Sequence, residues 1–260
     1  MCSATASACE KSSAWQHALL LLNDLNGGGN AFTYGAVVSA CGKAAEWQYA
    51  LALLQEAELR MLATVVTYSA TVTACEKAEE WPKALEVLRI AEERGEWNII
   101  TCNAGISACE KAQNWKQALL LLDHLVMKQL QPTLTSFNAA CSACEKSGEW
   151  QAAIFLLHEV GESSLVPDLI TFNSAISACG MAKHWQHALL LLGESQALEI
   201  QPDVLSFKGT LVGLSCTSQL FLGLLNQLQI AAESQVQKNS GRRFEKAHII
   251  FCAFPKQCET

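Results

Sequence analysis

Apolar residues recur along the chain at the 3.6-residue spacing of a helix face, in two alternating stripes. In the first stripe, Phe172, Ile176 and Cys179 fall at i, i+4 and i+7. A hydroxyl residue such as Thr171 stands just before this stripe, where its oxygen can cap free backbone amides. The pattern predicts an amphipathic first helix whose striped face is buried.

The second stripe begins at a Trp and continues with Leu at i+4 and i+7, as in Trp185, Leu189 and Leu192. A short polar break separates the two stripes, and a helix-stopping pair such as Pro202 and Asp203 follows the second one. Each unit is therefore expected to contain a first helix, a turn and a second helix. Six Trp residues, 32 to 35 residues apart, mark the units: Trp15, Trp47, Trp81, Trp115, Trp150 and Trp185.

A fixed period of this length is typical of repeat architectures. One helix pair cannot hide both stripes, but stacked pairs can, because each stripe then meets that of a neighbour. Burial of a large apolar side chain contributes roughly 1.5–3 kcal/mol, so the units offset chain entropy only when they touch. We predict an all-α fold of the α–α superhelix type, a right-handed solenoid of stacked helix–turn–helix repeats.

The period places an array of about seven repeats over residues 1–234, with a tail of unclear structure over residues 235–260. Met1 falls inside a first helix, so we expect the array to start mid-unit with no secretory or transit segment before it. The last unit loses its Cys and Trp, which is typical of a terminal cap. The predicted units are 1–30 (partial), 31–64, 65–98, 99–133, 134–168, 169–203 and 204–234 (degenerate).

The composition limits which kinds of structure and binding site the chain is expected to have. Half of the residues are apolar, which indicates an ordered chain, and no apolar run approaches the roughly 18 residues of a membrane span. Six of twelve Cys recur in one slot of the first stripe, which we interpret as apolar packing in a reducing compartment. Cys141 and Cys144 resemble half a zinc knuckle, but both are stripe residues, and His184 and His187 are expected to face solvent. We predict no metal and no cofactor.

The net charge of −7 argues against nucleic-acid binding by bulk charge alone. A Lys nevertheless lies two residues after most of the repeat Cys. On a helix, Asn138 and Lys146 lie about 80° apart, so Lys and Asn flank one face away from the Cys stripe. This column either faces phosphates or is a solvated column that only keeps the protein soluble. The predicted phosphate-facing lysines are Lys43, Lys77, Lys111 and Lys146.

The repeat unit resembles the pentatricopeptide repeat, of the type built from tandem 35-residue units. The opening Ile-Thr-Phe-Asn at 170–173, the Ala-Leu pair at 188–189 and the closing Gln-Pro-Asp at 201–203 are similar to that family's motifs. The resemblance covers about residues 1–234. The tetratricopeptide repeat is the runner-up, but that family keeps an early aromatic residue and Gly where this chain keeps Thr-aromatic-Asn and Pro-Asp.

This resemblance implies single-stranded RNA binding at one base per repeat. In the family, the Asn after the aromatic residue and the last residue of the unit choose the base, and the residue three places before that Asn clamps it. Carried over, the pairs imply a site near 5′-A-Y-U-U-3′, where Y is a pyrimidine: Ser69 with Asn98, Asn103 with Thr133, Asn138 with Asp168, and Asn173 with Asp203. The implied clamps are Phe32, Val66, Ile100, Thr135 and Ile170.

Two features limit this interpretation. Gly35 with Thr64 departs from the family pattern, because glycine has no side chain with which to read a base. A plainer role for each Asn is ordinary hydrogen bonding at the start of a helix.

The family mostly acts in plastids and mitochondria, so the resemblance implies organelle RNA processing, stability or translation, in a mitochondrion or a chloroplast. The predicted function is sequence-selective binding of single-stranded RNA. The alternative is a protein-interaction scaffold, which the acidic charge and the Trp-rich repeats favour. We expect no enzyme activity, because the sequence shows no phosphate loop, nucleophile elbow or zinc-deaminase motif. No membrane partner is expected, and protein partners and the oligomeric state stay open.

Overall fold

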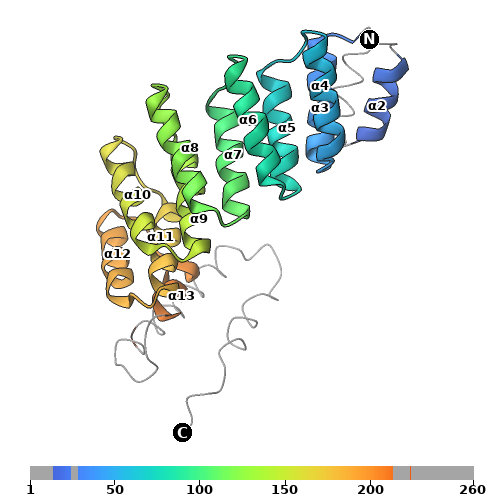
Figure 1. Ribbon diagram of the computed structural model, residues 1–260. Coiled ribbons are helices and arrows are strands. Elements are labelled where there is room, and N and C mark those ends of the chain that lie inside the picture. Colours follow the sequence, from blue (N-terminus) through green and yellow to red (C-terminus); the bar gives the residue numbers. More distant parts are fainter. Residues whose placement is uncertain (1–13, 25–28, 213–222, 224–260) are drawn as a thin grey trace. The chain divides into compact units, whose positions relative to one another are not determined.

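The structure is a computed structural model that describes residues 14–24, 29–212 and 223 of the chain (Figure 1). All regular structure in these residues is α-helical, as the sequence predicts, and the fold is an all-α helical-repeat superhelix. The helices are α2 (Trp15–Asp24), α3 (Ala31–Lys43), α4 (Trp47–Leu59), α5 (Val65–Lys77), α6 (Trp81–Glu93), α7 (Ile99–Lys111), α8 (Trp115–Met127), α9 (Leu134–Ser147), α10 (Trp150–Glu162), α11 (Leu169–Met181), α12 (Trp185–Ala197) and α13 (Val204–Val212).

The chain divides into two compact units, residues 1–143 and residues 144–260. In the first unit, α3 packs against α4 and α5, α5 packs against α6 and α7, and α7 packs against α8 (Figure 1). In the second unit, α11 packs against α10, α12 and α13. Each unit thus places successive first helices side by side. The start of one repeat consequently lies beside the first helix of the repeat before it.

The first helices begin at capping residues because their opening backbone amides have no partner within the helix. The side chain of Asn98 accepts a hydrogen bond from the amide of Thr101 at 2.9 Å, and the Thr101 hydroxyl accepts one from the amide of Asn98 at 2.9 Å. Asp168 and Thr171 form the same capping box at the start of α11. These caps fix the residue at which each repeat begins.

The turns between paired helices use a residue in the left-handed backbone region. Ala45 has a φ of 61° and Gly148, at the equivalent turn, has a φ of 73°. The next amide, that of Glu46, then bonds the carbonyl of Cys41 at 3.0 Å, which closes the end of the first helix. The second helix consequently starts with its Trp two residues after the left-handed one.

The first stripe is buried in the described repeats. Phe172 is 2% exposed, and Ile176 and Cys179 are fully buried, as are the equivalent residues of α3 and α5. The described cysteines on this stripe are free thiols, and burial raises the pKa of Cys75 and of Cys179 to about 11. Cys9 lies outside the described residues. The repeated Cys is therefore a small apolar packing residue.

The second stripe is shifted from its predicted position. The described Trp rings are only half-buried, as is Leu189, whereas Leu191 and Leu192 are each 4% exposed. The residue three places after each Trp is instead a fully buried Ala, so the packed face of the second helix is centred closer to this Ala than to the Trp. The Trp ring therefore lies at the edge of this face, where Trp15 stacks on Tyr49 with ring centroids 5.0 Å apart. These fully buried alanines are Ala18, Ala50, Ala84, Ala118, Ala153 and Ala188.

Candidate nucleic-acid interface

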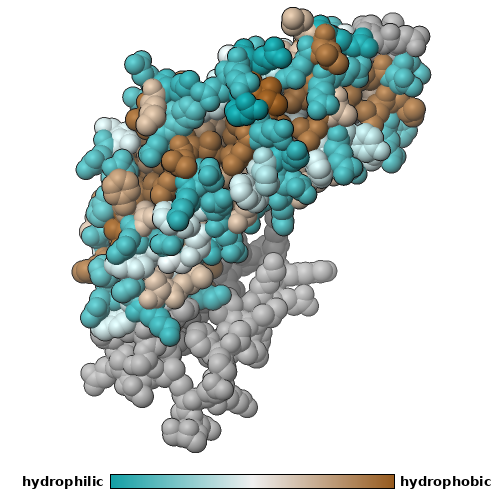
Figure 2. All heavy atoms as spheres, in the orientation of Figure 1, coloured by the Kyte–Doolittle hydropathy of each residue, from teal (hydrophilic) through white to brown (hydrophobic). Residues whose placement is uncertain are grey.

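Every predicted clamp residue is exposed at the second position of a first helix. The next residue on the same turn, such as Thr171, is fully buried, and successive helix residues point about 100° apart, so the second position faces away from the core. Hydrophobic residues reach the surface elsewhere too, as the face in Figure 2 shows, but here they recur at the same position in successive first helices other than α9. The exposed fractions are 60% for Phe32, 57% for Val66, 63% for Ile100 and 59% for Ile170, and Thr135 is exposed at the same position of α9.

Leu205, which is 59% exposed, occupies this position in α13. The sequence reasoning missed it because the degenerate last unit has lost its Cys and Trp markers. The Ser-Phe pair at residues 206–207 was the available signal, since it stands where Thr-Phe stands in the preceding repeat. An exposed second-position residue therefore occurs in one more repeat than the predicted clamps, beside Ile170 in the second unit.

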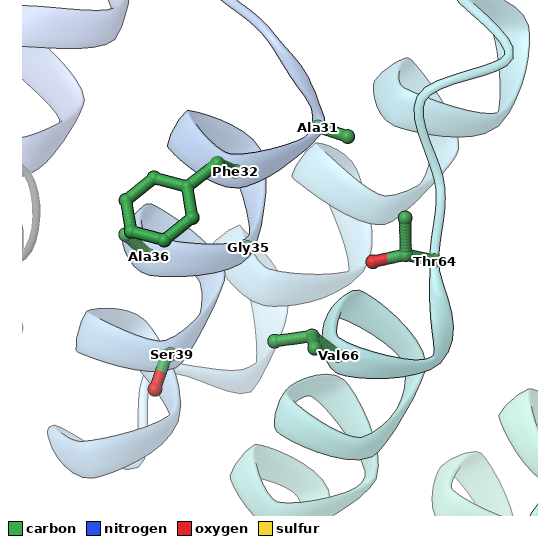
Figure 3. A pocket seen from close by; sticks show the side chains of 7 residues that line it. All are labelled: Ala31, Phe32, Gly35, Ala36, Ser39, Thr64 and Val66. Atoms are coloured by element: carbon green, nitrogen blue, oxygen red, sulfur yellow. The ribbon is translucent and has the colours of Figure 1, made fainter. Parts of the chain in front are cut away.

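A hollow of about 390 Å³ lies between two of these residues in the first unit. Figure 3 shows the Phe32 ring on α3 and the Val66 side chain on α5, with Gly35 and Thr64 beside them. A Cβ on Gly35 would lie 3.4 Å from Cγ1 of Val66, which is ordinary contact, so the glycine leaves room rather than relieving a clash. The lining is mostly apolar: Ala31, Phe32, Gly35, Ala36, Ser39, Thr64 and Val66.

Asn103 on α7 and Thr133 meet at the start of α9, in the first unit. Nδ2 of Asn103 donates to Oγ1 of Thr133 at 3.4 Å, and Oγ of Ser136 donates to Oδ1 of Asn103 at 2.6 Å. The Ser136 hydroxyl is fully buried beneath the half-exposed amide. The Thr133 hydroxyl also lies 3.0 Å from that of Thr135 and 3.0 Å from that of Ser136. These side chains form one connected group at the start of α9.

Asn173 and Asp203 form the corresponding group in the second unit. Nδ2 of Asn173 donates to Oδ1 of Asp203 at 3.1 Å, and Oγ of Ser206 donates to Oδ1 of Asn173 at 2.5 Å. Oδ1 of Asp203 also accepts from the backbone amides of Leu205 at 2.9 Å and Ser206 at 3.1 Å. Asp203 therefore caps α13 and holds Asn173 with the same oxygen.

The predicted pair of Ser69 and Asn98 is not joined in this way. Ser69 donates to the carbonyl of Val66 at 3.1 Å, and the side chain of Asn98 is occupied in its own capping box with Thr101. Asn138 is half-buried on α9, in the first unit, and Asp168 caps α11, in the second unit. Each of these two residues is described here only within its own unit.

The predicted phosphate-facing lysines are exposed in the last turn of their helices, but they already have partners. Nζ of Lys111 lies 3.2 Å from Oε1 and 3.4 Å from the carbonyl oxygen of Glu76 in the preceding repeat. Nζ of Lys77 lies 3.4 Å from the carbonyl oxygen of Lys43. Lys43 and Lys146 also have partners. Lys77 and Lys111 thus bind the negative ends of neighbouring helices, a placement that helix dipoles favour.

The remaining candidates do not build a metal site in the described residues. His184 and His187 are exposed, and their rings stack on Trp150 at centroid distances of 4.2 and 4.9 Å. Cys141 and Cys144 are both fully buried. No group of three or more metal-ligating side chains is found where the structure describes the chain. Within the same ranges, no helix is long and apolar enough to cross a membrane.

Two family models match the sequence. A model described as the pentatricopeptide repeat domain matches residues 86–147, and the pentatricopeptide repeat model matches residues 32–60 and 170–199. No curated protein sequence matches the chain. The matched segments include all or nearly all of the α3–α4, α7–α8 and α11–α12 pairs.

Solved structures are similar to the chain in fold. The pentatricopeptide repeat protein PPR10 from maize matches with 22% identity and a TM-score of 0.63, over 90% of this chain and 34% of PPR10. PPR10 in complex with an 18-nt psaJ RNA element matches with 20% identity and a TM-score of 0.68, over 92% of this chain and 38% of PPR10. The chain thus spans about a third of the length of PPR10.

A third match is more distant. The pentatricopeptide repeat domain of Arabidopsis thaliana protein-only RNase P 1, in complex with tRNA, has 11% identity and a TM-score of 0.54. This match covers 70% of this chain and 92% of that domain. At this level of identity the similarity concerns the arrangement of the helices alone.

Proposed function

The chain is a pentatricopeptide repeat protein, and from that premise we propose that it binds single-stranded RNA with one base at each repeat. One observation carries the proposal: an exposed apolar side chain recurs at the second position of five of the six described first helices, one turn before the position of the predicted reading residue. A nucleobase needs an apolar surface for its face and a hydrogen-bonding group for its edge. The repeat supplies both within one helical turn.

The hollow between Phe32 and Val66 supports this arrangement, because it lies between the clamp positions of two successive repeats. An aromatic ring and an aliphatic side chain suit the two faces of a base, since stacking tolerates every base. Gly35 offers the base no reading group. We therefore propose that this repeat holds a base without selecting it.

The hydrogen-bonding capacity of Thr133 and Asp203 supports the base preference that we propose for the Asn103 and Asn173 groups. The carboxylate of Asp203 accepts hydrogen bonds but donates none, so it favours the N3–H of uracil over the bare N3 of cytosine. The Thr133 hydroxyl both donates and accepts, so it suits either pyrimidine. Within the proposed sequence 5′-A-Y-U-U-3′, this difference supports a pyrimidine at the second base, read by Asn103, and uridine at the fourth, read by Asn173.

The proposal extends to organelle RNA processing, stability or translation. Its support is the family resemblance alone. Two matched structures contain RNA, an 18-nt psaJ RNA element and a tRNA, which supports RNA as the class of partner.

The test is fluorescence polarisation with short RNAs that carry AYUU or a scrambled core, and with DNA of the same sequence. Ile100→Asp and Ile170→Asp place a charge against the proposed base face. Leu120→Asp and Leu190→Asp are matched controls, because these leucines are 58% and 65% exposed on second helices. The Ile variants should lose at least tenfold in affinity for AYUU RNA, whereas the Leu variants should bind like the native chain.

A protein-interaction scaffold is the second candidate, favoured by exposed apolar residues five places after the Trp of several second helices. Equal loss of RNA affinity in the Ile and the Leu variants would contradict the proposed base contact. If the native chain binds none of the oligonucleotides at tens of micromolar and low salt, the scaffold becomes the better proposal. The exposed residues that favour it are Leu20, Leu120, Phe155 and Leu190.

A further inference from the structure

Two buried serines form hydrogen bonds with the side-chain amides of Asn103 and Asn173. Ser136 is fully buried and Ser206 is 1% exposed, and both occupy the third position of a first helix. Elsewhere this position holds a Thr whose hydroxyl bonds within its own turn, as Thr67 bonds the carbonyl of Thr64 at 2.7 Å. The two serines additionally reach the repeat before them, where each donates to the Oδ1 of an Asn.

These hydrogen bonds determine which way each carboxamide faces. Each serine hydroxyl already accepts a backbone amide at 3.1 Å, that of Thr133 for Ser136 and that of Asp203 for Ser206, so its proton is what it offers to Oδ1. An amide that turned over would lose this bond unless the hydroxyl turned as well. Nδ2 then points to the last residue of the repeat and donates one of its two hydrogens there. The second hydrogen of Nδ2 remains for a ligand.

We propose that Ser136 and Ser206 are positioning residues that fix the amides of Asn103 and Asn173 so that each presents one N–H to the RNA base. The inference rests on the proposed RNA binding and adds the reason for a pyrimidine preference. Uracil and cytosine both carry an O2 acceptor at the same place on the ring, and a fixed donor recognises it in either base. The residue at the end of the repeat then separates the two pyrimidines.

The two serines are expected to matter unequally. At Asn173, the carboxylate of Asp203 can only accept, so it selects the Nδ2 side of the amide even without Ser206. At Asn103, the Thr133 hydroxyl can accept from Nδ2 or donate to Oδ1, whereas the Ser136 hydroxyl already accepts the backbone amide of Thr133, so Ser136 is the group that favours one orientation. Removal of the Ser136 hydroxyl should therefore let the Asn103 amide turn over.

The experiment compares the affinities of the full chain for RNAs that differ only in the second base, ACUU and AUUU against AAUU and AGUU, in common flanks. In Ser136→Ala the pyrimidine-over-purine ratio should fall about fivefold, the worth of a neutral hydrogen bond of about 1 kcal/mol. Ser136→Thr keeps a hydroxyl and should restore the ratio. In Ser206→Ala, the same ratio at the fourth base should fall by no more than about twofold.

Thr67→Ala is the control for a purely structural role. It removes a helix-start hydroxyl of the same kind, but the preceding repeat has Gly35 at the reading position, so no amide depends on it. This variant should keep the native ratio. An unchanged ratio in Ser136→Ala, or an equal fall in Thr67→Ala, would overturn the role of the serines while RNA binding stands. A native chain without preference for AYUU over its scramble would overturn both proposals together.

Discussion

The groups around Asn103 and Asn173 use the same three positions of the repeat but differ in the residue that closes each group. Thr133 closes the first with a hydroxyl that is exposed and joined to two other hydroxyls. Asp203 closes the second with a carboxylate that is half-buried and bonded to the amides at the start of α13. A hydroxyl leaves the orientation of its Asn to a neighbour, whereas a carboxylate decides it. One substitution at the end of a repeat thus changes how strictly that repeat can select a base.

The largest effect is expected from a mutation in the contact between α11 and α13, the helices at which the Asn173 group lies. α11 and α13 approach backbone to backbone at Gly180 and Gly209, where a Cβ on Gly180 would lie 1.9 Å from the carbonyl oxygen of Gly209. Gly180→Ala must push the two helices apart, and such overpacking costs about 1–3 kcal/mol of unfolding free energy. It should also separate Asp203 and Ser206 from Asn173, so the preference at the fourth base should disappear.

Urea unfolding followed by circular dichroism measures the first effect, and RNA binding measures the second. Gly193→Ala is the matched control, because nothing lies within 4 Å of a Cβ at this exposed position of α12. It should be neutral or stabilise the chain by up to about 1 kcal/mol, as Ala favours helices over Gly. The preference at the second base should survive in both variants. Its loss in Gly180→Ala would mean that the two groups do not act independently.

An exchange of the closing residues tests the chemistry directly. Asp203→Thr should reduce the preference for uridine over cytidine at the fourth base by about tenfold, or about 1.4 kcal/mol, because a hydroxyl can bond N3 of either pyrimidine. Thr133→Asp should create a uridine preference at the second base. Thr and Asp are both good N-cap residues, so the free energy of unfolding should change little in either variant. Unchanged ratios in both variants would show that the closing residue does not separate the pyrimidines.

The sequence could predict which side chains meet at these groups, but not how they are held. Asn103 and Thr133 are one repeat apart, and stacking of successive repeats brings such positions together. Ser136 looked like an ordinary helix-start residue, since its bond to Asn103 depends on how closely α9 lies beside that Asn. The shifted second stripe has a similar cause, because Ala188 is recognised as part of the packed face only once the helices are placed.

The contacts of the lysines could not be predicted from the sequence either. Their period predicts a column, and the structure places them at the ends of the first helices. The sequence does not reveal that Lys111 contacts Glu76, because 35 residues separate them and the contact depends on the stacking of α7 on α5. Leu205 was missed for the opposite reason, since its position is regular in space while the motif around it has decayed.

The smallest expected effect concerns a lysine that lies near the Asn103 group and has no counterpart near the Asn173 group. Lys111 follows Asn103 by eight residues on α7, about 12 Å along the helix, whereas the equivalent residue on α11 is Met181, which is 53% exposed. A lysine that contacts an RNA phosphate adds about 0.7 to the slope of log affinity against log salt. Because Lys111 is already bonded to Glu76, Lys111→Met should lower the slope by less than that and the affinity by less than about threefold.

Met181→Lys is the converse variant, and it should steepen the slope and raise the affinity at low salt by a similar small factor. Binding of AYUU RNA measured between about 50 and 200 mM salt yields both slopes. A fall of the full 0.7 in Lys111→Met would mean that Lys111 leaves Glu76 to bind a phosphate, so the contact with Glu76 would belong to the RNA-free chain alone. The base preferences should be the same in both variants, because phosphate contacts position the strand without reading it. A changed preference would place the lysine near a base edge and would tie charge to selection in this repeat.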